Sequence, residues 1–150
     1  MSELLLPPLL SDYRVAITLP VQWGDMDAMG HVNNTVFFRW FESARVEYLD
    51  RISLQSSSHK LGPILASVKC DYRRQLNFPD DVTIAARVTR LGRTSLSMVH
   101  AVFSREQQAI VAEGDSTIVV FDYQANRPHP IPEALREAIA KIEGRTFEEA

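Results

Sequence analysis

One stretch of helical periodicity interrupts a chain that otherwise alternates like β-structure. Apolar residues recur three or four positions apart from Phe37 to Ile52, which predicts a helix of about four to five turns. Before it, alternation from Tyr13 to Val21 predicts one half-buried strand, and Pro20 indicates an edge strand or a strand end. After it, period-two alternation predicts four more strands, over about 64–72, 82–88, 96–102 and 110–121.

Short turns join the four later strands, so the sheet is expected to be antiparallel. Turn-forming residues fall at 77–81, 91–94 and 105–108, and connections of this length join antiparallel neighbours. Gly114 within the last run is expected to mark a bulge. A short amphipathic helix follows Pro132. One long helix on one sheet is a two-layer α+β arrangement, and residues 1–150 are expected to form one domain.

Composition narrows the classes of protein. A net charge of -3 gives no global electrostatic case for nucleic-acid binding. No apolar run approaches the roughly 20 residues of a membrane helix. The single cysteine, Cys70, excludes an internal disulfide framework and fits a reducing compartment. The first residues lack the basic start of a secretion signal, so a cytoplasmic protein is expected.

Residues 23–34, Trp-Gly-Asp-Met-Asp-Ala-Met-Gly-His-Val-Asn-Asn, carry the chemistry. Two acids, a histidine and two amides converge just before the predicted helix start. This order sets a carboxylate beside unpaired backbone N–H groups and the positive end of a helix dipole. Such N–H groups can stabilise an oxyanion, and a carboxylate can act as nucleophile or general base. The combination favours attack on a carbonyl group.

Other interpretations of these residues remain open at this point. The spacing of an EF-hand calcium loop fails, because its twelfth position is Val36 instead of Glu. A metal site from Asp25, Asp27 and His31 would lack a second His or Cys nearby. In a purely structural role, Asp25 and Asn33 would cap the helix and hold the loop, and Asp25 is expected to do so.

The same segment, followed by Trp-Phe-Glu-x-Ala-Arg at 40–45, closely resembles the 4-hydroxybenzoyl-CoA thioesterase family, which has the hotdog fold. Residues 70–74 and 78–80 also resemble that family, and the resemblance runs over about 13–121. It implies a long central helix wrapped by a five-stranded antiparallel sheet. It also implies a hydrolase that converts an acyl-CoA thioester to a carboxylic acid and free CoA, without a cofactor or a metal.

The resemblance assigns roles to individual residues. The catalytic carboxylate is the second acid, Asp27, as nucleophile or general base, and Asp25 is structural. The oxyanion donor is the backbone N–H seven residues later, at Asn34. His31 is expected to line the substrate pocket or hold the loop. Glu42, on the helix, is a rival acid for which a buried polar pairing is expected instead.

Coenzyme A carries phosphates, so arginines are expected near the pocket mouth. By resemblance, the turn with Arg93, Thr94 and Ser95 contacts the CoA phosphates. An ordinary hairpin with solvated arginines is the alternative interpretation of this turn. Arg73 and Arg74 are further candidates.

Two other functions compete with hydrolysis. A hydratase or dehydratase acting on acyl-CoA or acyl carrier protein typically uses an Asp/His pair five apart, whereas Asp27 and His31 are four apart. The other is a non-catalytic module that binds or senses acyl-CoA. No DNA-binding helix pair is visible in the sequence, which disfavours a transcriptional regulator of this kind. By resemblance, the active unit is a homodimer or homotetramer with its site between subunits. Aromatic, short aliphatic and long fatty acyl groups all fit the pattern, and acyl carrier protein could replace CoA.

Overall fold

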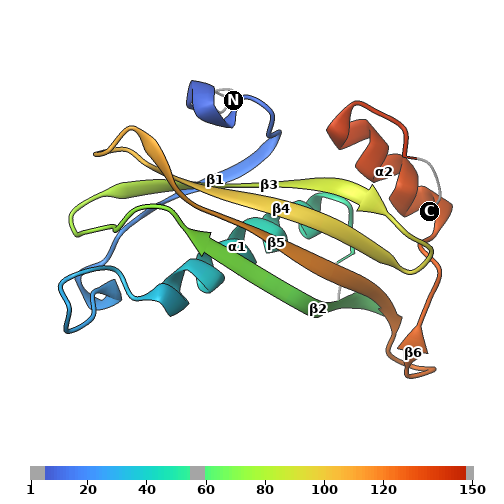
Figure 1. Ribbon diagram of the computed structural model, residues 1–150. Coiled ribbons are helices and arrows are strands. Elements are labelled where there is room, and N and C mark those ends of the chain that lie inside the picture. The colour runs from blue at the N-terminus through green and yellow to red at the C-terminus, as the bar shows by residue number, and fades with distance from the viewer. Residues whose placement is uncertain (1–5, 55–59, 148–150) are drawn as a thin grey trace.

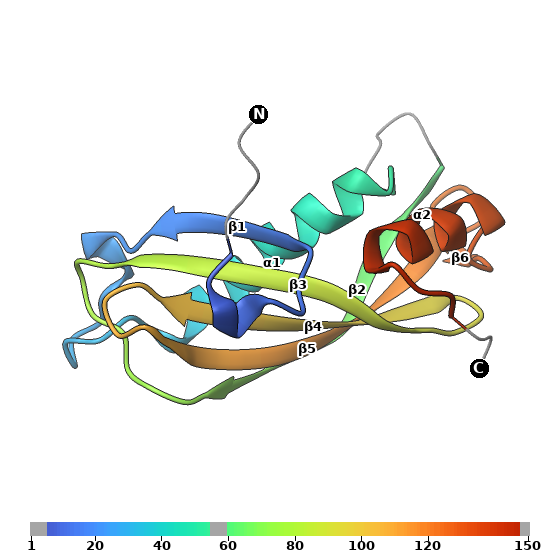
Figure 2. The same ribbon diagram turned by 90° about the horizontal axis from the view of Figure 1, so that it is seen from above.

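A curved antiparallel sheet wraps one long helix (Figures 1 and 2). The computed structural model describes residues 6–54 and 60–147. The elements in chain order are η1 (Pro8–Leu10), β1 (Val15–Pro20), η2 (Trp23–Asp25), α1 (Asn34–Arg51), β2 (Leu61–Tyr72), β3 (Asp81–Leu91), β4 (Ser95–Ser104), β5 (Ala109–Asp122), β6 (Arg127–Pro128) and α2 (Glu133–Glu143). The predicted hotdog α+β fold is confirmed, with two short 3-10 helices and the two-residue β6 as additions. The polar residues 53–62 predict a loop between the long helix and the next strand, and residues 55–59 of it lie outside the described residues.

The sheet order is β1-β3-β4-β5-β2, and β6 pairs with β5. Every strand pair is antiparallel, as predicted. The turn at 77–81 does not join neighbouring strands, contrary to the prediction, because β2 pairs with β5 while β3 pairs with β1 and β4. β1 and β2 are therefore the edges. Pro20 is the last residue of β1, where its missing N–H costs no ladder hydrogen bond, so both expectations for it are met.

Gly114 does not mark a bulge, contrary to the prediction. It pairs in regular register with Cys70 on one side and His100 on the other. A Cβ at Gly114 would lie 2.3 Å from the Lys69 carbonyl oxygen and 2.5 Å from the Phe41 ring. The glycine is thus required because the β2 backbone and the Phe41 ring of α1 both lie close to it, and not because of a break in the ladder.

The buried face of α1 is the predicted apolar stripe. Phe37, Trp40, Phe41, Ala44 and Tyr48 are buried against the concave side of the sheet. They join strand residues that point inward, including Ile84 of β3, Met98 of β4 and Ile118 of β5, in one hydrophobic cluster.

Glu42 is exposed, so the predicted buried pairing of this acid is wrong. Its position lies off the stripe formed by Phe41 and Ala44, and the helix turns its side chain to solvent. The buried charge on α1 is Arg45 instead, whose side chain is 7% exposed. Burial lowers the pKa of Arg45, and the nearby charge of Glu42 opposes that change.

The C-terminal helix α2 covers the part of β3 that β1 leaves unpaired (Figure 2). Pairing with β1 ends at Val15 opposite Ala86. Beyond that point, one carboxylate oxygen of Glu143 accepts the Val88 N–H at 3.1 Å and the Tyr48 hydroxyl at 2.5 Å. Glu143 therefore ties together α1, β3 and α2.

Replacing Glu143 with Ala is expected to lower the free energy of unfolding by about 2–4 kcal/mol, since it strands two buried donors. Denaturant unfolding measures this change. Glu137→Ala, on the exposed side of the same helix, is the matched control and should stay within about 0.5 kcal/mol of the parent. Equal effects of the two substitutions would contradict the role of Glu143.

No helix in the described part of the chain is long and apolar enough to cross a membrane.

Candidate active site

A tight loop precedes α1 and presents Asp27. Met26 and Val32 form an isolated bridge, and the Asp27 N–H donates to the His31 carbonyl at 2.9 Å. The Gly30 N–H donates back to the Asp27 carbonyl at 3.1 Å, with a Gly30 φ of 81° that favours glycine. The loop is closed by its own backbone and holds Asp27 in a half-buried position.

Within the described part of the chain, one oxygen of the Asp27 carboxylate has a hydrogen-bond partner and the other has none. Oδ1 accepts the Met29 N–H at 2.9 Å. Among the described residues, no ion pair includes Asp27 and Oδ2 accepts no hydrogen bond. One carboxylate oxygen orients the side chain, and the other remains available for chemistry.

The first turn of α1 leaves the backbone N–H of Asn34 open. Oδ1 of Asn33 accepts the Thr35 N–H at 2.9 Å, and the Asn33 carbonyl accepts the Val36 N–H at 3.0 Å. The Asn34 N–H has no acceptor within residues 6–54 and 60–147. The helix therefore begins with an open N–H group at the positive end of its dipole.

Asp27 and Asn34 line the same cavity, which has a volume of about 310 Å³. The loop, the first turn of α1 and the segment that ends β2 form its walls. The lining residues are Asp27, His31, Val32, Asn34, Phe37, Tyr72, Arg73, Arg74, Gln75 and Leu76. Asp27, His31, Asn34, Arg73 and Arg74 are site residues predicted from the sequence, whereas Tyr72, Gln75 and Leu76 are not. The family-like motif at 70–74 contains Tyr72 and could have indicated it, whereas Gln75 and Leu76 follow that motif and had no signal of their own.

His31 lines the cavity, and its imidazole ring contacts the side chain of Asn77, which lies outside the Asp27 loop. Its Nδ1 lies 3.0 Å from the side-chain amide of Asn77. With its amide nitrogen turned toward the loop, Asn77 donates to this Nδ1 and to the Gly30 carbonyl, each at 3.0 Å. In that arrangement a neutral His31 carries its proton on Nε2.

Asp25 is occupied by structural contacts. Its Oδ2 accepts the Gln22 N–H at 2.8 Å, and its carbonyl accepts the Asn33 N–H at 2.9 Å. Within the described part of the chain, no three His, Cys, Asp or Glu side chains converge as metal ligands would. Asp25, Asp27 and His31 therefore do not form a ligand set, and Asp25 holds the loop as expected.

The turn with Arg93, Thr94 and Ser95 lies at the other end of the sheet from the start of α1 (Figures 1 and 2). The Gly92 N–H closes it on the Ser95 carbonyl at 2.7 Å, and the Ile131 N–H donates to the Arg93 carbonyl. Within one chain this turn is not part of the Asp27 cavity. Its contact with CoA stays a prediction.

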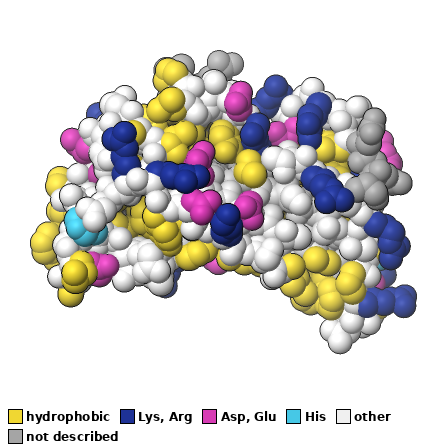
Figure 3. Space-filling view, in the orientation of Figure 1, with side chains coloured by type: hydrophobic (Ala, Val, Ile, Leu, Met, Phe, Trp, Pro, Cys, Tyr) yellow, Lys and Arg dark blue, Asp and Glu magenta, His cyan; other side chains and the backbone are white. Residues whose placement is uncertain are grey.

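The basic residues that do line the Asp27 cavity are Arg73 and Arg74. Arg73 pairs with Glu113 at 3.4 Å. On the face shown in Figure 3, Lys and Arg are interspersed with Asp and Glu, so this face presents no continuous basic stripe.

Two other side chains with reactive groups lie outside this cavity, the buried His100 and the half-buried Cys70. His100 is 1% exposed, stacks on Phe41 and has its Nε2 2.9 Å from the Ser116 hydroxyl. Burial and the charge of Arg45 lower the pKa of His100 to about 3, so it is neutral at neutral pH. Burial raises the pKa of the Cys70 thiol, which disfavours the thiolate needed for nucleophilic attack.

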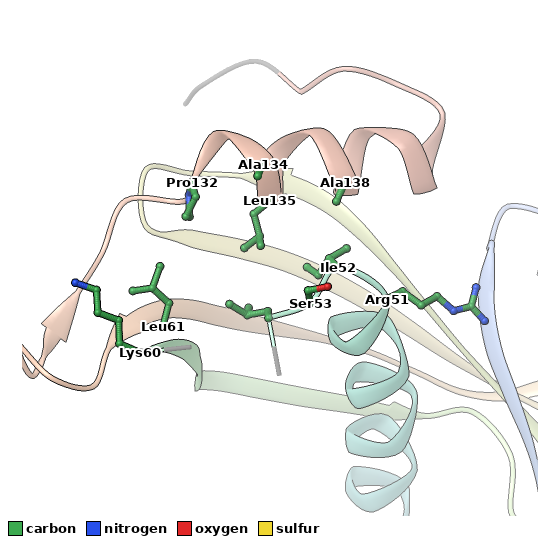
Figure 4. Close-up of a pocket in the computed structure, with 10 residues that line it drawn as sticks. Arg51, Ile52, Ser53, Lys60, Leu61, Pro132, Ala134, Leu135 and Ala138 are labelled. Atoms are coloured by element: carbon green, nitrogen blue, oxygen red, sulfur yellow. The ribbon is translucent and has the colours of Figure 1, made fainter. Parts of the chain in front are cut away.

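A larger cavity of about 530 Å³ lies between the end of α1, the start of β2 and α2 (Figure 4). Apolar side chains such as Ile52, Leu61 and Leu135 line it, with Arg51 and Lys60 at the side. Among the residues that the structure describes, the lining of this cavity has no carboxylate or imidazole. The chemistry therefore points to the smaller cavity with Asp27.

Comparison with known proteins agrees with this geometry. The profile of the thioesterase-like superfamily matches residues 21–139. The chain belongs to this superfamily. This match confirms the resemblance to hotdog thioesterases, and it assigns the protein to the thioester hydrolases.

Two solved structures are similar to this chain over most of its length, and one relative is similar over about half of it. A thioesterase from Thermus thermophilus, crystallised with coenzyme A and zinc, is 36% identical with a TM-score of 0.81, covering 91% of this chain and 98% of that one. The PA2801 protein of Pseudomonas aeruginosa is 32% identical with a TM-score of 0.77, covering 85% and 99%. YsmA of Bacillus subtilis is 30% identical over 78 residues, 52% of this chain. That match spans about half of YsmA, 53% of its length.

Proposed function

We propose that this thioesterase hydrolyses acyl-CoA thioesters to a carboxylic acid and free CoA. Asp27 acts as nucleophile or general base, and the backbone N–H of Asn34 donates to the oxyanion. The observation that carries the proposal is that a carboxylate with a free oxygen and an open helix amide line one cavity. The similar Thermus thermophilus thioesterase, crystallised with coenzyme A, supports CoA as the carrier.

The reaction has two forms that use the same groups. Either the free oxygen of Asp27 attacks the thioester carbonyl and expels CoA thiolate, after which water hydrolyses the anhydride, or Asp27 takes a proton from an attacking water. In both forms negative charge develops on the carbonyl oxygen, where the Asn34 N–H and the dipole of α1 stabilise it. CoA thiolate is a reasonable leaving group, so a strong general acid is not required.

A thiol-release assay tests the proposal. Purified protein is incubated with short, long and aromatic acyl-CoAs and with an acyl carrier protein thioester, and free thiol is followed with a disulfide dye. We expect at least one CoA ester to release many molecules of thiol per molecule of protein. Hydration of an enoyl-CoA without thiol release would favour the hydratase instead. Binding of acyl-CoA without any turnover would favour the non-catalytic module.

We also propose that two copies associate through β2. This strand is 12 residues long, forms one edge of the sheet and is exposed at 65–67 near its centre. A long edge strand is a template for pairing with another strand, and β2 keeps regular register with β5 on both sides of an irregularity between Leu65 and Ser67. Antiparallel pairing of two such edges would bring the end of the sheet that carries one copy's Arg93 turn toward the Asp27 cavity of the other. Such a pair would let that turn contact CoA.

Replacing Ala66, at the irregularity of β2, with Lys is expected to convert the proposed dimer largely to monomer, because a charged side chain on an edge strand opposes pairing of two edges. Light scattering after size-exclusion chromatography measures the mass. Thr18→Lys places the same charge on the opposite edge strand, β1, and is expected to leave the dimer intact. A monomeric parent protein, or dissociation by both substitutions, would rule out pairing through β2.

A further inference from the structure

One short segment contacts both halves of the proposed site. At its start, the Tyr72 hydroxyl donates to the Asn34 carbonyl at 2.7 Å. Four residues on, the Leu76 carbonyl accepts the Val32 N–H at 2.8 Å, in the loop that presents Asp27. The segment after β2 therefore bridges the first residue of α1 and the Asp27 loop.

Tyr72 is well placed to act through this bond. Its ring packs edge-on against Phe37, with centroids 5.1 Å apart and planes at 86°, so the hydroxyl is aimed by a buried neighbour. The side chain is 44% exposed and lines the cavity. Burial raises the pKa of Tyr72 to about 12, so the hydroxyl keeps its proton and donates at neutral pH.

The first turn of a helix needs such an anchor. Its N–H groups lack intrahelical acceptors, and helix ends fray easily. The cap at Asn33 engages the amides of Thr35 and Val36 but not that of Asn34. The hydroxyl of Tyr72 holds Asn34 from its carbonyl side. This contact limits the tilt of the residue whose N–H must point at the reacting oxygen.

We propose that Tyr72 is a positioning residue that sets the direction of the Asn34 N–H relative to the Asp27 carboxylate. The proposal rests on the proposed function, because it assigns Tyr72 a role only if the Asn34 N–H serves the oxyanion. Tyr72 acts through Asn34 and transfers no proton itself.

The test compares Tyr72→Phe with Tyr123→Phe. The Tyr123 hydroxyl also donates to a backbone carbonyl at 2.7 Å, that of Pro63 near the other end of β2, outside the Asp27 cavity. Tyr72→Phe is expected to lower kcat about tenfold with KM within about twofold, since small misplacement of a reacting group costs rate more than binding. Tyr123→Phe is expected to keep the kcat of the parent. Equal kcat in the parent and Tyr72→Phe would overturn the proposal.

Two further readouts separate positioning from other roles. The pH dependence of kcat should keep its shape in Tyr72→Phe; loss of one limb would show direct proton transfer by the hydroxyl and overturn the positioning role. The backbone order parameter of the Asn34 amide, measured by 15N relaxation, should fall below the value of about 0.85 that is typical of a rigid backbone. An unchanged order parameter would overturn the proposal that the Tyr72 hydroxyl holds Asn34 in place. This readout needs no turnover, so it stands even if the parent released no thiol and the proposed function failed.

Discussion

Replacing Asp27 with Asn is expected to lower kcat by about 100- to 10,000-fold, the range lost when a positioned base or nucleophile is removed. In the parent, the Met29 N–H donates to Oδ1 of Asp27 at 2.9 Å. Asn has an Oδ1 that can accept the same hydrogen bond, so the loop should keep its conformation. The amide, however, can neither attack a carbonyl nor take a proton from water. Steady-state thiol release measures kcat, and thermal unfolding followed by circular dichroism checks that the fold is retained.

Asp25→Asn is the control for this substitution, because it makes the same change two residues earlier. Asp25 accepts the Gln22 N–H and belongs to the loop framework. Its replacement is expected to cost less than about tenfold in kcat, since the acid takes no part in the chemistry. Turnover near that of the parent in Asp27→Asn would refute the assignment of Asp27.

Replacing Asn34 with Pro is expected to lower kcat by about 100- to 1,000-fold, as for loss of one oxyanion donor. Proline removes the backbone N–H and nothing else that the mechanism uses. The first helical position tolerates proline, and the preceding residue must then be extended. Asn33 already has φ -60° and ψ 139°, so the helix start should accept the change. The measurement is kcat by thiol release, with helix content compared by circular dichroism.

Asn34→Ala separates the backbone group from the side chain. It retains the N–H and is expected to lose less than about tenfold in kcat. If alanine and proline at this position had equal effects, the N–H would not be the oxyanion donor. A large loss in Asn34→Ala would instead assign a role to the amide side chain.

The main helix and strands, and the two central residues of the site, Asp27 and Asn34, were predictable from local sequence patterns. The period of 3.6 from Phe37 to Ile52 and the alternation elsewhere identified α1 and the five main strands. Asp27 and Asn34 are seven residues apart and belong to one loop and the helix start that follows it. Their proximity is therefore set almost entirely by the local chain. The family resemblance then assigned roles that periodicity could not.

The tertiary structure decided whatever depends on contacts between distant elements. Tyr72 meets Asn34 across 38 residues because β2 runs back along α1. The steric need for Gly114, the exposure of Glu42 and the separation of the Arg93 turn from Asp27 likewise depend on strand register and on which face each element buries. The physical reason is that periodicity records only which face of each element is apolar. The partner that covers that face is chosen by packing of the whole chain, which no short stretch of sequence contains.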